Sequence, residues 1–298
     1  MKYLSNLKIP LPCSWLEHAT NSAKENVTDL INLKIDLINI YANYDSIISQ
    51  YQLKPSSSTY EQHKVLLHSY YNSAPVKLNN ELINRRNNHG LLYCPYCGDP
   101  KIPDTLDHFI PKDDWPEFSF FPNNLVPQCR GCAPTKGYQY YCDTTNAVKF
   151  LHPIYFDTLD KLRFTISVSF DTTNNSIVFD IYYNLYNITS PAEEIRLINH
   201  IKNLKITKRI KAFCNQKYIY WKNKISTKEF DIEKALNQRI IEKDESDLQR
   251  DWETALYIGM LENKNLMFYL NSLAPKSKKN KSISKLVELK EYSILVID

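Results

Sequence analysis

Four cysteines in two matched pairs are the residues of this sequence best suited to chemistry. Cys94 and Cys97 form one CxxC pair, Cys129 and Cys132 form a second, and 31 residues lie between the pairs. Thiolates bind zinc tetrahedrally, and a two-residue gap lets one turn supply two ligands. Four thiolates leave no open position on the ion, so we expect a structural zinc and look for reactive groups elsewhere. The three remaining cysteines have no partner at this spacing.

The segment between the pairs carries two further motifs in order. Asp-His-x-x-Pro spans residues 107–111, and Asn-Leu-x-Pro spans residues 124–127. With the flanking CxxC pairs, residues 94–137 resemble the zinc-bearing members of the HNH (ββα-metal) endonuclease family. The resemblance implies a ββα-metal core built around a structural zinc, and metal-dependent cleavage of DNA phosphodiester bonds.

The resemblance gives roles to three polar residues, and their chemistry agrees with those roles. A histidine can deprotonate water near neutral pH, so His108 is the predicted general base. A carboxylate can hold Mg²⁺ or Mn²⁺, so Asp107 is the predicted ligand of a catalytic divalent ion. Adjacent strand residues face opposite ways, so both can serve one site only where the strand ends. Asn124 is expected to brace the loop or orient His108. Taken singly, His108 is better interpreted as a surface histidine and Asn124 as a turn residue, but their place within the motif favours the predicted roles.

The sequence departs from the family pattern at one position. Family members usually carry Asn or His after the last cysteine, where that residue completes the catalytic metal site, but here Ala133 follows Cys132. Alanine cannot ligate a metal. Three explanations are open. Either another residue supplies the metal ligand, or the protein is a relative that binds without cleaving, or the alanine is an engineered substitution that inactivates the enzyme. The intact remainder of the motif favours the substitution.

Four more residues are candidates for the site. Lys136 matches the lysine of the family, and with Lys112 and Arg130 it is predicted to contact nucleic-acid phosphates, although a lysine at this place can also simply end a short helix. His152 begins a His-Pro-Ile-Tyr segment that resembles larger HNH proteins of bacterial defence systems. We consider His152 a second candidate metal ligand, and an ordinary loop histidine fits the segment equally well.

Hydrophobic periodicity predicts the elements around this core. Helical spacing extends over 14–52 and 59–88, strict alternation over 163–170 and 177–183 predicts a hairpin, and helical patterning returns over 190–272. Residues 292–297 could add a last strand. We therefore expect an α+β protein with an N-terminal helical region (1–90), a zinc-bound HNH core (91–160), and a hairpin plus mainly helical C-terminal region (161–298).

Composition is consistent with an ordinary globular protein. The chain has 298 residues, 43% of them hydrophobic, and a formal net charge of +4, which allows a local basic groove and equally a plain soluble enzyme. No apolar run approaches the roughly 18 residues of a membrane span, and the N-terminus lacks a signal-peptide core, so we expect a cytoplasmic protein with no membrane partner. A basic tract near the end is better interpreted as a solvated linker than as a phosphate contact: Lys276, Lys278, Lys279, Lys281 and Lys285.

Three functions compete on this sequence. The first is a DNA nuclease, similar to the HNH subunits of Septu-type antiphage defence; because no phosphate-binding Walker loop is present, any ATP use would come from an ATPase partner. The second is a non-catalytic zinc-bound module that binds nucleic acid or protein, for which Ala133 is the best argument. The third is an RNA nuclease, since some of the 21 tyrosines could stack on unpaired bases, although core and interface positions account for tyrosines equally well.

Overall fold

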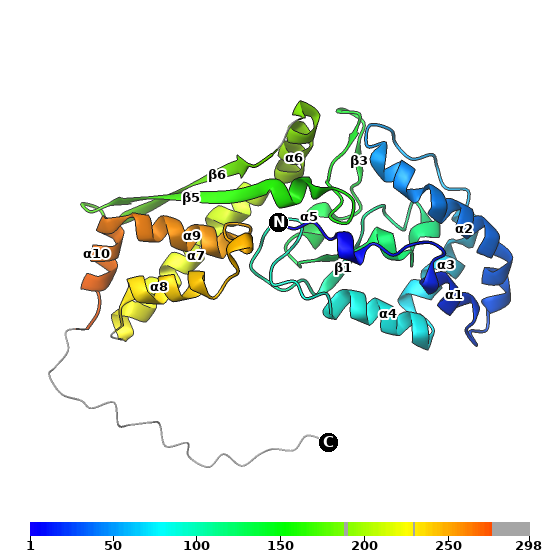
Figure 1. Ribbon diagram of the computed structural model, residues 1–298, viewed down its shortest axis with the longest axis horizontal. Coiled ribbons are helices and arrows are strands. Elements are labelled where there is room, and N and C mark those ends of the chain that lie inside the picture. Colours follow the sequence, from blue (N-terminus) through cyan, green and yellow to red (C-terminus); the bar gives the residue numbers. More distant parts are fainter. Residues whose placement is uncertain (188–189, 229, 276–298) are drawn as a thin grey trace, which may run out of the picture.

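Mixed helices and short antiparallel strand pairs make up the computed structural model, which describes residues 1–187, 190–228 and 230–275 (Figure 1). The expected α+β class is confirmed: within these ranges the strands form three two-stranded antiparallel sheets among many helices. The molecule is elongated, with the N-terminal helices at one end and the long hairpin with its helices at the other. None of the described helices is both long enough and apolar enough to cross a bilayer.

The N-terminal helices are shorter than periodicity predicted. They are η1 (Ser5–Leu7), α1 (Ser14–Thr20), α2 (Val27–Ser49), η2 (Glu61–His63), α3 (Lys64–Asn72) and α4 (Val76–Asn87). The expected continuous helix over 14–52 is therefore wrong, since a polar loop divides α1 from α2. The expected helix over 59–88 also breaks, before α4, because Pro75 lacks an N–H group and disfavours helical geometry in the residue before it.

Helix α2 packs its buried face on the loop that contains Phe121, in the middle of the chain. That face carries side chains at helical spacing, namely Leu30, Leu37, Tyr41, Tyr44 and Ile48. Tyr41 stacks on Phe121 with ring centroids 4.1 Å apart, and Tyr44 meets the same ring edge-on at 5.0 Å. Burying an aromatic ring of this kind stabilises the fold by about 1.5–3 kcal/mol. Helix α2 thereby supports a segment that is too short to build a core of its own.

The central region contains a small strand pair followed by a short helix. Its elements are β1 (Thr105–His108), η3 (Pro116–Phe118), η4 (Pro122–Asn124), β2 (Leu125–Gln128), α5 (Ala133–Lys136), β3 (Tyr141–Cys142) and β4 (Ala147–Val148). Strands β1 and β2 are antiparallel, with Asp107 opposite Val126 and His108 opposite Leu125. Strand β1 ends at His108, three residues before Pro111, so the predicted strand end is where the geometry required it.

The hairpin predicted from strict alternation is confirmed and is slightly longer than expected. It follows η5 (Asp157–Lys161) and pairs β5 (Leu162–Asp171) with β6 (Ser176–Leu185). Helix α9 (Trp252–Glu262) crosses β5, and a Cβ atom built on Gly259 would lie 1.8 Å from the carbonyl oxygen of Ile166. Only glycine lets the helix approach the strand this closely.

The C-terminal region is helical over residues 190–272, as periodicity predicted, although it is divided. It contains α6 (Pro191–Asn203), α7 (Ile206–Thr227), α8 (Ile232–Ile241), η6 (Glu245–Asp247), α9 and α10 (Lys264–Ser272). Pro191 occupies the first turn of α6, where its missing N–H group costs nothing. The possible strand at 292–297 and the basic tract at 276–285 lie outside the described residues.

Candidate metal centre and active site

The four paired cysteines converge on one buried point. All four are buried, and their sulfur atoms lie within 4.8 Å of one another. The Sγ atoms of Cys97 and Cys129 are 3.8 Å apart. A tetrahedral zinc with Zn–S bonds of about 2.3 Å separates its sulfurs by about 3.8 Å. The donor set, its burial and its spacing thus fit a structural zinc ion, and they hold the start of α5 beside β1 and β2.

The first pair sits on a tight turn that needs glycine. The amide of Gly98 donates to the carbonyl of Cys94 (2.8 Å), and the amide of Cys94 donates to the carbonyl of Asp99 (2.9 Å). Gly98 has a φ of +77°, and a Cβ there would lie 2.7 Å from the carbonyl oxygen of Arg250. This backbone geometry and the close approach of the C-terminal region both exclude a side chain at position 98.

Arg209 of α7 lies against the sulfur cluster, and sequence reasoning missed it. Its guanidinium donates to the sulfurs of Cys132 (3.2 Å), Cys97 (3.4 Å) and Cys129 (3.5 Å). Four thiolates around a divalent ion carry a net charge of −2, which a neighbouring cation offsets. Because Arg209 follows Cys132 by 77 positions, no local spacing could have identified this contact.

Replacing Arg209 by methionine should weaken zinc binding while leaving the fold largely in place. Methionine keeps much of the side-chain volume but removes the positive charge beside the thiolates. Loss of such an outer contact typically lowers metal affinity by about 10–100-fold. Competition with a zinc chelator measures the change, and Lys208→Met, at the exposed neighbouring position, is the matched control. Equal zinc retention in both variants would contradict this role.

The Asp107 carboxylate is held on both oxygens. The Tyr96 hydroxyl donates to Oδ2 (2.6 Å), and the Lys136 ammonium lies 3.0 Å from Oδ1. Lys136 is 1% exposed and also donates to the backbone carbonyls of His108 (3.1 Å) and Phe109 (3.2 Å). The ammonium therefore neutralises Asp107 inside the protein, which differs from the predicted surface contact with phosphate.

His108 has a defined proton position. Its Nε2 lies 2.8 Å from the carbonyl oxygen of Ser119. A carbonyl only accepts hydrogen bonds, so Nε2 carries the proton and Nδ1 keeps a free lone pair. Burial lowers the pKa of His108 to about 3, aided by the positive charges of Lys112 and Lys136 and opposed by the Ser119 carbonyl. The ring is therefore neutral at physiological pH, as a general base must be before it reacts.

Asn124 ties together the loop between β1 and β2. Its Oδ1 accepts from the Tyr44 hydroxyl (2.7 Å) and the Ile110 amide (2.8 Å). Its Nδ2 donates to the carbonyls of Ile110 (3.0 Å) and Phe118 (3.2 Å). The predicted bracing role agrees with these contacts. Phe118 precedes Ser119, so Asn124 also positions the carbonyl that orients His108.

Asn124→Ala should cost more stability than the loss of any one of these bonds. The change leaves buried Ile110 and Phe118 groups without partners, each costing about 1–3 kcal/mol, so we expect a total near 3 kcal/mol. Tyr44→Phe removes only one bond to the same side chain and should cost about 1 kcal/mol. Urea denaturation measures both values, and equal losses would show that Asn124 acts through Tyr44 alone.

His152 lies in the core and is not among the residues that line the hollow with Asp107 and His108. It is fully buried, its Nδ1 accepts from the Ile154 amide (3.2 Å), and its ring lies 4.1 Å from that of Phe109. Its Nε2 lies 3.4 Å from the Tyr44 hydroxyl. These contacts give His152 a core setting rather than the predicted ligand position beside Asp107.

A hollow of about 570 Å³ brings the predicted active-site residues together. Its lining comprises Leu106, Asp107, His108, Pro111, Lys112, Gln128, Ala133, Pro134, Gly137 and Tyr138. Of the residues predicted to bind phosphate, Lys112 lines the hollow and Arg130 does not. The Lys112 ammonium is on the wall, 3.3 Å from Asp113, whereas Arg130 is exposed outside the lining and pairs with Asp104. Ala133 shares one opening with Asp107 and His108, although 24 residues separate it from His108 in the sequence.

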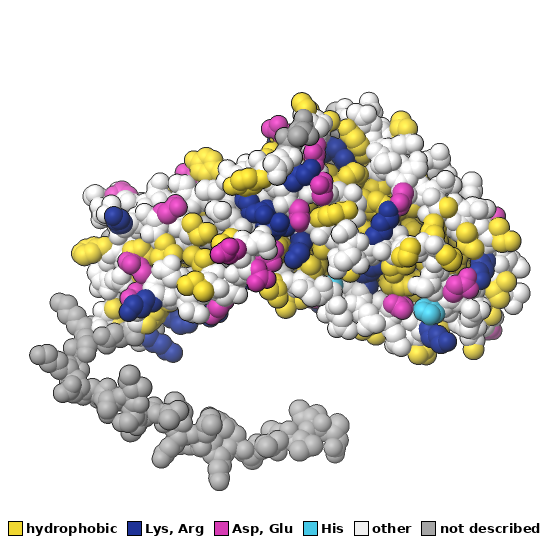
Figure 2. Space-filling model, viewed as in Figure 1, with side chains coloured by type: hydrophobic (Ala, Val, Ile, Leu, Met, Phe, Trp, Pro, Cys, Tyr) yellow, Lys and Arg dark blue, Asp and Glu magenta, His cyan; other side chains and the backbone are white. Residues whose placement is uncertain are grey.

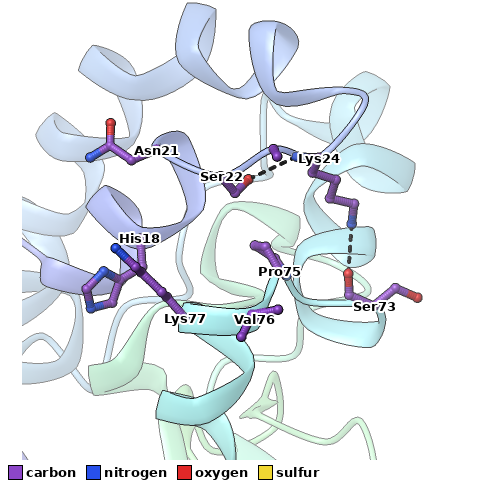
Figure 3. Close-up of a pocket in the computed structure, with 9 residues that line it drawn as sticks. His18, Asn21, Ser22, Lys24, Ser73, Pro75, Val76 and Lys77 are labelled. Atoms are coloured by element: carbon purple, nitrogen blue, oxygen red, sulfur yellow. Dashed lines mark hydrogen bonds between the residues drawn. The ribbon is translucent and has the colours of Figure 1, made fainter.

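A second hollow, of about 450 Å³, lies between the α1–α2 loop and the start of α4 (Figure 3). The Lys24 ammonium at its edge donates to the carbonyl oxygens of Ser69 (2.7 Å) and Ser73 (3.0 Å). This lysine thus ties the loop to α3. None of the predicted active-site residues lines this hollow, and we assign it no chemistry.

The fold and site define an α+β protein with a four-cysteine cluster suited to zinc, and with a hollow onto which Asp107 and His108 open. A curated protein with sequence similarity is protein ea31 of Escherichia phage lambda, which is 30% identical over 145 residues. The similarity covers 42% of this chain and 49% of the phage protein, so this chain spans about half the length of that relative. No family model matches the sequence, and no solved structure matches the fold.

Proposed function

We propose that this protein is an HNH endonuclease that cleaves DNA phosphodiester bonds with a divalent metal ion. One observation carries the proposal: Asp107 and His108, at the end of β1, open onto the same hollow as the start of α5. The order of strand, strand and helix, with cysteine pairs holding its ends, agrees with the ββα-metal core implied by the sequence resemblance.

The side chains in the hollow fit the proposed reaction. Each Asp107 oxygen accepts one contact, from Tyr96 or Lys136, and keeps a second lone pair for a hard divalent cation, which prefers such oxygens. Mg²⁺ or Mn²⁺ bound there would stabilise the negative charge that develops on the phosphate. His108 accepts a proton from the attacking water at Nδ1, and the Ser119 carbonyl stabilises the resulting imidazolium through Nε2. Lys136 pairs with one oxygen of Asp107 and so fixes the direction of the carboxylate.

Positive charge suited to a nucleic acid is found at the hollow itself and not over a broad surface around it. Lys112 provides positive charge on the wall, and Tyr138, which is 76% exposed, offers an aromatic face. On the face drawn in Figure 2, basic and acidic side chains are interspersed over both halves of the molecule, and neither sign forms a broad area. We therefore place the phosphate contacts at the hollow. Tyr138 could also stack on an unpaired base, which keeps RNA as the minor alternative.

The biological setting proposed here is antiphage defence, with an ATPase as partner. It rests on the resemblance of the sequence to HNH proteins of Septu-type systems. Co-purification with the product of a neighbouring ATPase gene tests this setting separately from the chemistry.

The second candidate is a zinc-bound module that binds nucleic acid or protein without cleaving it. Ala133 favours this function, because it removes a side chain from the wall of the hollow where the family carries a metal ligand. The neutral, oriented His108 and the buried Asp107–Lys136 pair favour the nuclease, since simple binding requires neither.

Plasmid cleavage separates the two candidates. Purified protein and its Ala133→Asn variant are incubated with supercoiled DNA and Mg²⁺ or Mn²⁺. Cleavage by the chain with Ala133 supports the nuclease with a complete site, and cleavage by Ala133→Asn alone supports a nuclease disabled at that position. DNA binding by fluorescence anisotropy, with no cleavage by either form under any metal, would instead favour the binding module.

A further inference from the structure

Gln128 is a buried polar side chain that the fold does not use. It ends β2, is 2% exposed and lines the hollow that contains Asp107 and His108. Its backbone carbonyl accepts from the Thr105 hydroxyl (2.7 Å). Among the described residues, none accepts a hydrogen bond from its Nε2 atom. A buried amide without a partner costs about 1–3 kcal/mol, so an apolar residue here would serve the fold better.

The strand register places Gln128 opposite Thr105 and diagonal to Asp107. Asp107 pairs with Val126, and Gln128 lies two residues further along the same strand. Side chains at alternate strand positions share a face, and diagonal neighbours across a strand pair lie within reach of long side chains. The carboxamide of Gln128 and the carboxylate of Asp107 therefore approach the hollow from one face of the strand pair.

We propose that Gln128 supplies a carboxamide oxygen to the divalent cation held by Asp107, in place of the ligand that Ala133 cannot provide. This inference rests on the proposed nuclease function. The two ends of a carboxamide are told apart only by their hydrogen bonds, and no bond from Nε2 fixes them here, so the oxygen can turn toward the cation. Amide carbonyl oxygens are suitable ligands for hard cations.

The other residues of the hollow are poorer candidates for this position. Five of them have no side-chain atom that can donate electrons to a metal: Leu106, Pro111, Ala133, Pro134 and Gly137. Lys112 is a cation, and Tyr138 is largely exposed on the rim. His152, the alternative from the sequence, does not line the hollow. Gln128 therefore remains as the uncharged oxygen donor beside Asp107.

Mn²⁺ titration followed by electron paramagnetic resonance, without nucleic acid, tests the proposal. Gln128→Leu should weaken Mn²⁺ binding by about tenfold or more, a loss at least as large as that of an outer contact. Gln128→Glu, which adds a charged oxygen at the same place, should tighten it. Binding by Gln128→Leu equal to that of the natural chain would overturn the proposal, as would the absence of Mn²⁺ binding by the natural chain. Weaker binding by Gln128→Glu would also overturn it, since it would show that the amide end faces an anion.

A second variant separates loss of a ligand from damage to the fold. Gln128→Leu should retain zinc and melt no lower than the natural chain, because it removes an unpaired buried polar group. Adding Ala133→Asn to Gln128→Leu should restore Mn²⁺ binding from the opposite wall, and failure to do so in folded, zinc-loaded protein would count against a shared site. Mn²⁺ binding is read without DNA, so absence of cleavage in every form would reject the nuclease but not this cation site.

Discussion

Cys129→Ser is expected to release zinc and unfold the central region. Zinc binding to four-ligand structural sites is worth about 10–16 kcal/mol at neutral pH, which is as large as the whole stability of a typical domain, about 5–15 kcal/mol. Cys129 donates one of the four clustered sulfurs and lies between β2 and α5. Without the ion, little apolar burial of its own holds α5 beside Asp107 and His108.

Metal analysis and thermal unfolding measure this effect together. The natural chain should contain a single zinc ion, and Cys129→Ser should contain almost none and lose its cooperative melting transition. Cys142→Ser is the matched control, because Cys142 is outside the cluster and only half-buried. A zinc-free Cys129→Ser protein with an unchanged melting curve would show that packing against α2 and α7 suffices to hold the region.

His108→Ala is expected to abolish cleavage in whichever form of the protein cuts DNA. Removing a general base typically lowers the rate by about 10²–10⁴-fold. The imidazole donates to the Ser119 carbonyl and packs edge-on against Tyr71 with ring centroids 4.5 Å apart. Its loss should therefore reduce the rate far more than the stability. Zinc content and DNA affinity should stay close to those of the parent.

The pH profile gives an independent reading of the same residue. Burial lowers the pKa of His108 to about 3. A base with a depressed pKa stays neutral until the pH falls well below the ordinary histidine value of about 6.5, so protonation of His108 should not slow cleavage between about pH 6 and pH 8. His63→Ala, a substitution on η2 away from the hollow, is the control and should leave the rate unchanged. Full cleavage by His108→Ala would reject its role as the base.

The placement of the candidate site shows where sequence reasoning succeeds. Cysteine spacing predicted a four-ligand cluster, because two residues between ligands are enough for a single turn to present both. The strand end at His108 and the bracing by Asn124 also agree with expectation. The cysteine spacing and the strand end are local features of the chain, whereas the bonds of Asn124 to Tyr44 and Ile110 were implied only by the resemblance.

Other predictions were incomplete because the surroundings of the residue depend on side chains that are distant in sequence. Lys136 was predicted to contact phosphate or to end a short helix; it ends α5, and its ammonium is enclosed against Asp107. His152 looked like a possible ligand, yet it packs in the core beside Phe109. Gln128 gave no signal in the sequence, because only the folded structure leaves its amide buried without a partner among the described residues.

The sequence by itself determined the α+β class, the hairpin of β5 and β6, and the grouping of four cysteines, because alternation and ligand spacing are local properties of the chain. Only the tertiary structure decided that Arg209 of α7 offsets the charge of the cysteine cluster and that Tyr96 and Lys136 hold Asp107. The physical reason is that burial and charge compensation depend on which surfaces pack together. That packing joins α7 to the first half of the chain, over separations that no local pattern records.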